Sequence, residues 1–178
     1  MLAAMMDASA LSRIATAPLG PYGEQYTLIA IGAIEVGQHL ALWDGMAIGR
    51  EDRTKHDRAA TTATCRSGSH DVLALVDNRN GLPVVMVRRP DAHVASWREL
   101  TIGFDFDGFA LIGPDPLPPI QPPKPASDAL KWVVVGRLPD GLGFVWIDDP
   151  SGGGEITAHV GLDAAGVIAA FVVELYWS

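Results

Sequence analysis

The chain has 178 residues, of which 48% are hydrophobic and 19% are charged, and its formal net charge is −8. This composition excludes a disordered chain, and no uncharged apolar run reaches the roughly 18 to 20 residues that a membrane helix requires. The length predicts one globular domain, residues 1–178, around a single core.

The first predicted element is a helix over residues 7–17. Either Asp7 or Ser9 can accept hydrogen bonds from the free backbone N–H groups of its first turn. Its apolar residues recur at helical spacing, at Leu11, Ile14 and Ala15.

Two strands are expected next, over residues 25–36 and 39–44. The first is apolar at both alternating sets of positions, so we expect it to be buried on both faces or to cross a core. Residues 50–69 differ, because they hold five basic and three acidic side chains and almost no large apolar residue. This segment is expected to form a surface helix or an edge strand together with a loop.

Two hairpins are predicted in the middle of the chain. Strands over 71–77 and 82–88 flank Asn80-Gly81, a pair that readily takes the positive φ angles of a tight turn. A short helix is expected over 91–98, after Pro90. Further strands over 99–106 and 109–112 are predicted to meet in a second hairpin at Asp107-Gly108.

Residues 113–126 form a proline-rich segment with seven prolines among positions 114–125. Proline at this density favours an extended polyproline II strap on the surface. Four strands with short polar connections then predict an antiparallel meander, over residues 129–138, 143–148, 155–162 and 167–177. The predicted fold is mainly β (α+β). It is an antiparallel meander of about nine or ten strands, with one or two short helices, in a curled sheet or a partly open barrel.

The negative charge lies entirely in the second half. Residues 1–98 hold ten acidic and ten basic side chains, whereas residues 99–178 hold eleven acidic and three basic ones. Such a field repels nucleic acid and anionic membranes and attracts basic partners. The single cysteine, Cys65, is typical of a reducing compartment, so a cytoplasmic location is expected.

No catalytic motif, metal-ligand spacing or cofactor motif is present, so no catalytic residue, metal or cofactor is predicted. Cys65 with His56 or His70 is a conceivable thiolate pair, because the charge of Arg66 would lower a thiol pKa.

The carboxylates near two predicted hairpin tips are the more informative group. They allow three interpretations: turn formation, a rim for a basic protein partner, or a glycosidase-like acid pair. We predict the partner surface, on Asp105, Asp107, Trp146, Asp148, Asp149, Gly152, Gly153 and Glu155. The glycines would let the backbone approach the partner closely.

In size, acidity, strand content and lack of a catalytic motif, the chain resembles small acidic bacterial immunity proteins. The resemblance implies a non-catalytic inhibitor that neutralises a toxin enzyme, such as a nuclease or an NAD-consuming enzyme, by blocking a basic active-site region. The alternative is a small-molecule-binding or cyclase/hydrolase-like protein with a pocket inside a curved sheet. A buried His or Asp in a strand interior would favour the alternative, and His159 is expected on the more polar strand face.

Overall fold

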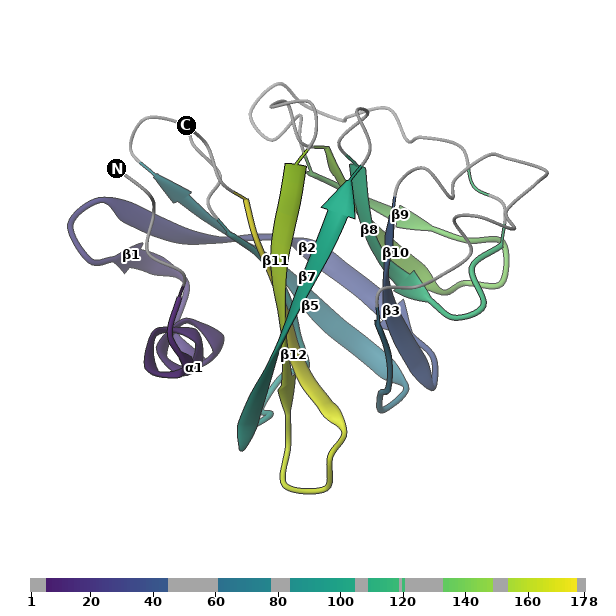
Figure 1. The fold of residues 1–178 in the computed structure, drawn as a ribbon, viewed down its shortest axis with the longest axis horizontal. Coiled ribbons are helices and arrows are strands. Elements are labelled where there is room, and N and C mark those ends of the chain that lie inside the picture. The colour runs from purple at the N-terminus through teal and green to yellow at the C-terminus, as the bar shows by residue number, and fades with distance from the viewer. Residues whose placement is uncertain are drawn as a thin grey trace.

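The computed structural model describes residues 6–44, 61–77, 84–104, 109–118, 120, 133–148 and 154–175. Within these residues the chain forms one helix and twelve strands, which build two antiparallel sheets (Figure 1). The mainly β fold class predicted from the sequence is confirmed, and the sheet is not closed into a barrel.

The larger sheet, sheet A, has seven strands and the smaller, sheet B, has five. In spatial order, sheet A contains β1 (Gly20–Tyr22), β2 (Tyr26–Val36), β5 (Gly68–Asp77), β6 (Val84–Arg88), β12 (Ile168–Glu174), β11 (Gly154–Leu162) and β7 (Ser96–Phe104). Sheet B contains β4 (Thr61–Thr64), β3 (His39–Asp44), β8 (Phe109–Pro114), β10 (Gly143–Asp148) and β9 (Val133–Arg137). β4 is an edge strand of this sheet, whereas residues 50–60 lie outside the described residues.

Several predicted strand pairs are confirmed. β5 and β6 are antiparallel neighbours, with Asp71 opposite Arg88, although their Asn80-Gly81 turn lies outside the described residues. β9 pairs with β10, and β11 pairs with β12.

The predicted meander and the second hairpin are wrong in their connections. β7 and β8 follow each other in sequence but belong to different sheets, and the same holds for β10 and β11. The turn-forming residues at Asp107-Gly108 and Ser151–Gly154 were typical of hairpins. Such residues bias the local backbone, but they do not determine which strand pairs with which.

The helix predicted over residues 91–98 is also wrong. Asp91 has a φ of 58°, outside the right-handed helical region, and Ser96 begins β7. β7 pairs with β11 along its whole length, from Ser96 opposite Leu162 to Phe104 opposite Gly154. The ladder of backbone hydrogen bonds to β11 outweighs the helix-start signal of Pro90.

The main core lies between the two sheets. It includes Val72 and Phe171 from sheet A and Leu42, Ile112 and Val145 from sheet B, all almost fully buried. Alternate residues of the same strands point to the two outer faces, because successive side chains of a strand face opposite sides.

Helix α1 (Ala8–Thr16) covers the outer face of sheet A. Of the two residues expected to cap it, Asp7 is the N-cap and accepts a hydrogen bond from the backbone N–H of Ala10. Its predicted apolar residues are buried with Leu73, Met86 and Val172. At the other end of the helix, Arg88 Nη1 donates to the carbonyl oxygens of Ala15 and Ala17.

Part of the proline-rich segment packs on the outer face of sheet B. Leu117 and Ile120 are buried there in one cluster with Trp43, Phe144 and Trp146. The described part of the proline-rich segment therefore contributes to the packing of the sheet and does not merely cross the surface.

Of the two alternatives expected for β2, burial on both faces is wrong. Its residues alternate between buried and exposed over Ala33–Val36, and Ala30 and Gly32 are exposed. A β-bulge between Ala30 and Gly32 shifts the register, so that Ile29 and Ile34 both contact the main core.

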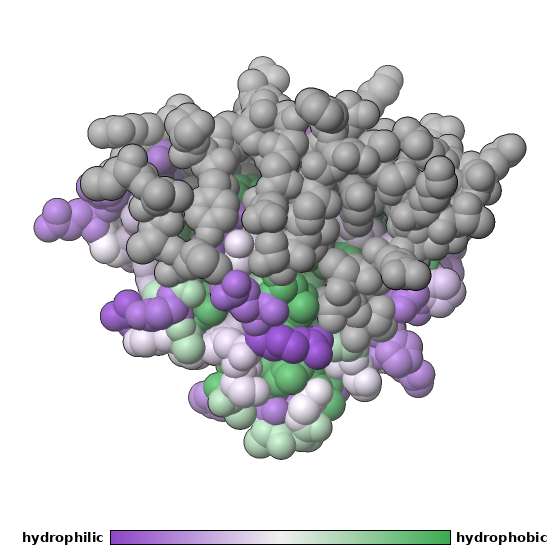
Figure 2. Space-filling view, in the orientation of Figure 1, coloured by the Kyte–Doolittle hydropathy of each residue, from purple (hydrophilic) through white to green (hydrophobic). Residues whose placement is uncertain are grey.

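The described residues contain no helix long and apolar enough to span a membrane. On the visible face, apolar residues are interspersed with hydrophilic ones in the described part (Figure 2). Leu19 is the one large apolar side chain, among the described residues, that is strongly exposed.

Candidate functional site

The two acidic connections begin and end beside each other. One runs from β7 to β8 and the other from β10 to β11, so both lead from one sheet to the other. Phe104, the last residue of β7, is opposite Gly154, and Phe109, the first residue of β8, is opposite Asp148. The strand ends that flank the two connections are therefore cross-strand neighbours, and we call these strand ends, together with the acidic residues next to them in the sequence, the acidic edge.

Most of the predicted partner residues lie in these connections. Asp105, Asp107, Asp149, Gly152 and Gly153 are outside the described residues. Asp148 is partly exposed at the end of β10. Glu155 lies in β11, where its backbone pairs with Gly103 of β7.

Trp146 occupies a different position from the other predicted residues. Its side chain is 4% exposed and packs in the cluster on the outer face of sheet B. A side chain this buried offers no surface to a partner, so Trp146 stabilises the strand that leads to Asp148.

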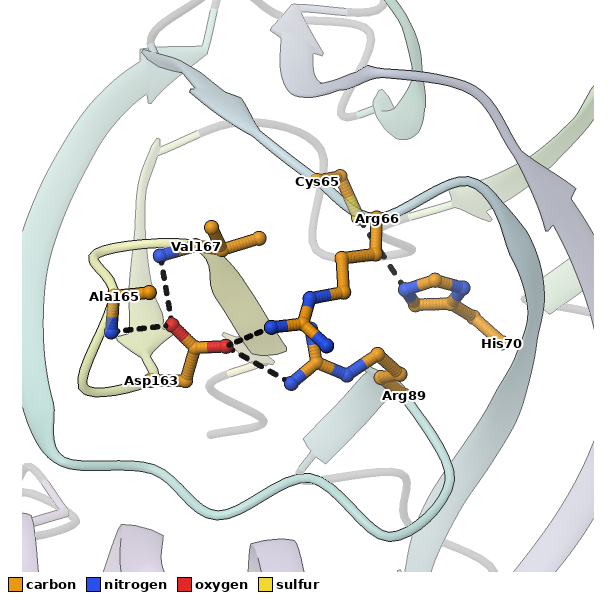
Figure 3. Close-up of polar contacts among 7 residues, drawn as sticks. All are labelled: Cys65, Arg66, His70, Arg89, Asp163, Ala165 and Val167. Carbon is orange, nitrogen blue, oxygen red and sulfur yellow. Dashed lines mark hydrogen bonds and ion pairs between the residues drawn. The ribbon is translucent and has the colours of Figure 1, made fainter.

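A second polar cluster lies at the other end of β11 from the acidic edge. Its residues lie where β11 and β6 end and where β5 begins (Figure 3). Cys65 Sγ is 3.3 Å from His70 Nε2, and His70 Nδ1 is 3.1 Å from the carbonyl oxygen of Gly68. Nδ1 can bind that oxygen only by donating, which leaves Nε2 as the acceptor for the thiol S–H. Of the two partners considered for Cys65, the structure brings His70 into contact, whereas His56 lies outside the described residues.

The electrostatics keep this pair neutral. Burial raises the pKa of the Cys65 thiol to about 11 and outweighs the positive charge of Arg89. Burial also lowers the pKa of His70. Both shifts disfavour a thiolate–imidazolium pair at neutral pH, so the contact is a satisfied polar interaction in the core.

Two arginines meet one carboxylate beside this pair. Asp163 Oδ2 accepts a hydrogen bond from Arg89 Nη2 at 3.0 Å, and Arg66 Nη2 lies 4.0 Å from the same oxygen (Figure 3). Asp163 Oδ1 accepts from the backbone N–H groups of Ala165 and Val167. These N–H groups, that of Val167 first, and the bond from Arg89 lower the pKa of Asp163. The charge of Arg66, which was expected to lower the pKa of Cys65, lies beside Asp163. Burial keeps the pKa of Cys65 raised.

His159 and Glu174 form a buried pair on the outer face of sheet A. His159 Nε2 lies 2.5 Å from Glu174 Oε1, which also accepts from the backbone N–H of Met6. His159 was expected on the more polar face of its strand. At this position that face is buried, and 3% of His159 is exposed.

Sequence reasoning missed Arg89, Asp163 and Glu174. Arg89 bonds Asp163 and Glu174 bonds Met6 across distant parts of the chain, and no spacing in the sequence predicts such contacts. In the part of the chain that the structure describes, no group of three or more His, Cys, Asp or Glu side chains is arranged to hold a metal ion.

No protein-family model matches the chain, and no curated protein or solved structure matches it either.

Proposed function

We propose that this chain is a non-catalytic, cytoplasmic inhibitor of the immunity type. It would neutralise a toxin enzyme, such as a nuclease or an NAD-consuming enzyme, by blocking its active site. The observation that carries the proposal is that the strand ends flanking the two acidic connections are cross-strand neighbours. Their carboxylates and those next to them belong to Asp105, Asp107, Asp148, Asp149 and Glu155, and neither connection contains a basic residue.

The chemistry of this edge fits a basic partner. Clustered carboxylates attract a positively charged active-site region and form charge-assisted hydrogen bonds with its Arg and Lys side chains. Gly152 and Gly153 carry no side chain, which lets the backbone of the second connection approach the partner closely. Trp146 and its cluster provide a rigid base for this contact.

The test uses the intact chain as bait in extracts of the cells that encode it. A second bait carries Asp148→Lys and Asp149→Lys, and a charge-matched control carries Glu35→Lys and Asp140→Lys at exposed positions elsewhere in the fold. We expect wild type and control to capture one basic protein, and the 148/149 variant to bind it about tenfold more weakly or worse.

The captured protein is then assayed as an enzyme with increasing amounts of the chain. Full inhibition by an equimolar amount of the wild-type chain supports the proposal. Circular dichroism of the 148/149 variant serves as the folding control for its weaker binding. Undiminished activity of the captured protein contradicts an inhibitor, and equal binding by all three baits contradicts the acidic edge as the contact.

One observation favours the alternative, a small-molecule site or enzyme inside the curved sheet. The criterion of a buried histidine on a strand is met by His70, which contacts Cys65 in the interior, and by His159 of β11, which is 3% exposed. Alkylation by iodoacetamide separates the alternatives, because Cys65 is the only cysteine of the chain. With a pKa of about 11, we expect slow labelling of the folded protein at neutral pH and faster labelling as pH rises. Rapid labelling at neutral pH, at the rate of the urea-unfolded chain or above, would indicate an activated nucleophile.

A further inference from the structure

One side of the β7 backbone has no strand opposite it among the described residues. β7 is the last strand of sheet A and pairs with β11 over nine consecutive positions, from Ser96 to Phe104, without a register shift (Figure 1). Alternate residues of a strand direct their backbone N–H and C=O groups to opposite sides, so half of these groups in β7 point away from β11. Such a row of donors and acceptors is a template for one further strand.

The other three edge strands of the described sheets are shorter. β1 has three residues and contains Pro21, which has no backbone N–H. β4 has four residues and β9 has five. β7 has nine residues, with no proline, no lysine and no bulge in its pairing with β11. Short strands, proline, lysine and bulges keep sheet edges apart, so β7 is the described edge best suited to accept a partner strand.

A second copy of the chain fits this edge by symmetry. Two β7 strands that continue one sheet across a two-fold axis are antiparallel, and opposite residues lie on the same face. The register that pairs all nine residues is centred on Leu100, which packs partly buried against the main core and would meet its own copy. Glu99 is then opposite Thr101. Arg98 is opposite Ile102, so no like charges oppose each other, whereas a register centred on Glu99 would oppose two carboxylates.

The antiparallel arrangement also separates the negative charge of the two copies. Each β7 ends at the acidic edge with Phe104, which would be opposite Ser96 of the other copy. A nine-residue strand is roughly 27 Å long, well beyond the roughly 10 Å over which charges act in 0.1 M salt. The two acidic edges therefore lie at opposite ends of the joined strands, where salt largely screens their mutual repulsion.

We propose that the chain forms a symmetric dimer in which two β7 strands pair and join both copies of sheet A into one continuous sheet. The contact is made by the backbone of β7, with Leu100 at its centre. It is separate from the acidic edge, and its failure would leave the proposed inhibitor function unaffected.

Sedimentation equilibrium of the full chain, from micromolar to near-millimolar concentration, measures the dimer. Thr101→Glu places a carboxylate opposite Glu99 of the other copy at two symmetric positions, and it should weaken dimerisation about tenfold. Thr101→Lys places an ammonium group there and should dimerise at least as strongly as wild type. Thr64→Glu is the matched control, because it makes the same exchange at an exposed position of β4, an edge strand of sheet B, and it should dimerise like wild type.

Hydrogen–deuterium exchange locates the contact. The backbone amides of residues 96–104 should exchange more slowly at high than at low protein concentration, while those of β4 should not change. Circular dichroism is the folding control for Thr101→Glu, and if this variant does not fold, Thr101→Lys and the exchange pattern decide. Weaker dimerisation of Thr101→Lys than of wild type, or slower exchange at β4 in place of β7, would overturn the proposal. Monomers at every concentration would overturn it in favour of another protein's strand as the occupant.

Discussion

Asp163 connects two segments of the chain through one carboxylate. One oxygen accepts two backbone N–H groups of its own turn, and the other accepts from Arg89, which follows β6. These bonds exist only in the folded protein, so they favour the ionised carboxylate there and lower its pKa below the ordinary value of 3.8.

This shift predicts a pH-dependent effect of Asp163→Asn. A lowered pKa contributes stability that is present above the unfolded pKa and is lost as pH falls through the folded pKa. We therefore expect urea denaturation to show the variant less stable than wild type near neutral pH. The difference should shrink as the pH falls below about 4. A difference that stays constant on acidification would show that the charge is not its cause.

The residues of the polar cluster were only partly predictable. Cys65 and His70 were considered together because they are close in sequence, but their neutral state follows from burial, which the sequence does not display. Arg89 and Asp163 are brought together by the pairing of β12 with β6 and β11. Contacts that depend on such distant pairing leave no local signal.

At the level of elements, strand positions were predicted well and strand partners less well. β10 was predicted at residues 143–148, where four consecutive apolar residues are bounded by Gly and Asp, and the structure gives Gly143–Asp148. Its connection to β11 was predicted as a hairpin, yet the two strands belong to different sheets. The choice between sheets depends on how both faces of each strand pack. Local strand propensity does not determine that packing.

The approach of the two sheets at β2 and β10 yields a second prediction. A Cβ atom added at Gly143 would lie 2.9 Å from Ile34 Cα and closer still to the side chain of Ile34. Because backbone cannot move aside cheaply, we expect Gly143→Ala to lower the free energy of unfolding by about 1–3 kcal/mol in urea denaturation.

Gly32→Ala is the matched control for this substitution. Its Cβ would lie 3.6 Å from Val135 Cγ2, an ordinary contact, so we expect little loss of stability. Equal stability of the two variants would contradict the close packing of Gly143 on Ile34.

At the level of the whole molecule, charge is distributed unevenly. All of the excess negative charge belongs to residues 99–178, the half that contains both acidic connections. The field of such a surface acts over about 10 Å at 0.1 M salt and falls off at higher ionic strength.

This distribution predicts how binding to the proposed partner depends on salt. Between about 0.05 and 0.5 M NaCl, we expect the association rate constant to fall about tenfold or more, with a much smaller change in the dissociation rate constant. Surface plasmon resonance with the purified partner measures both. An association rate that does not depend on salt would remove electrostatic steering from the proposed mechanism.

The strand order of sheet A has a consequence for biosynthesis. β12 lies between β6 and β11, and both of these precede it in the chain. Until β12 has been made, the apolar strand β6 keeps an open edge, whose unpaired backbone groups can recruit other chains. A nascent chain arrested before Ile168 would therefore be prone to aggregate.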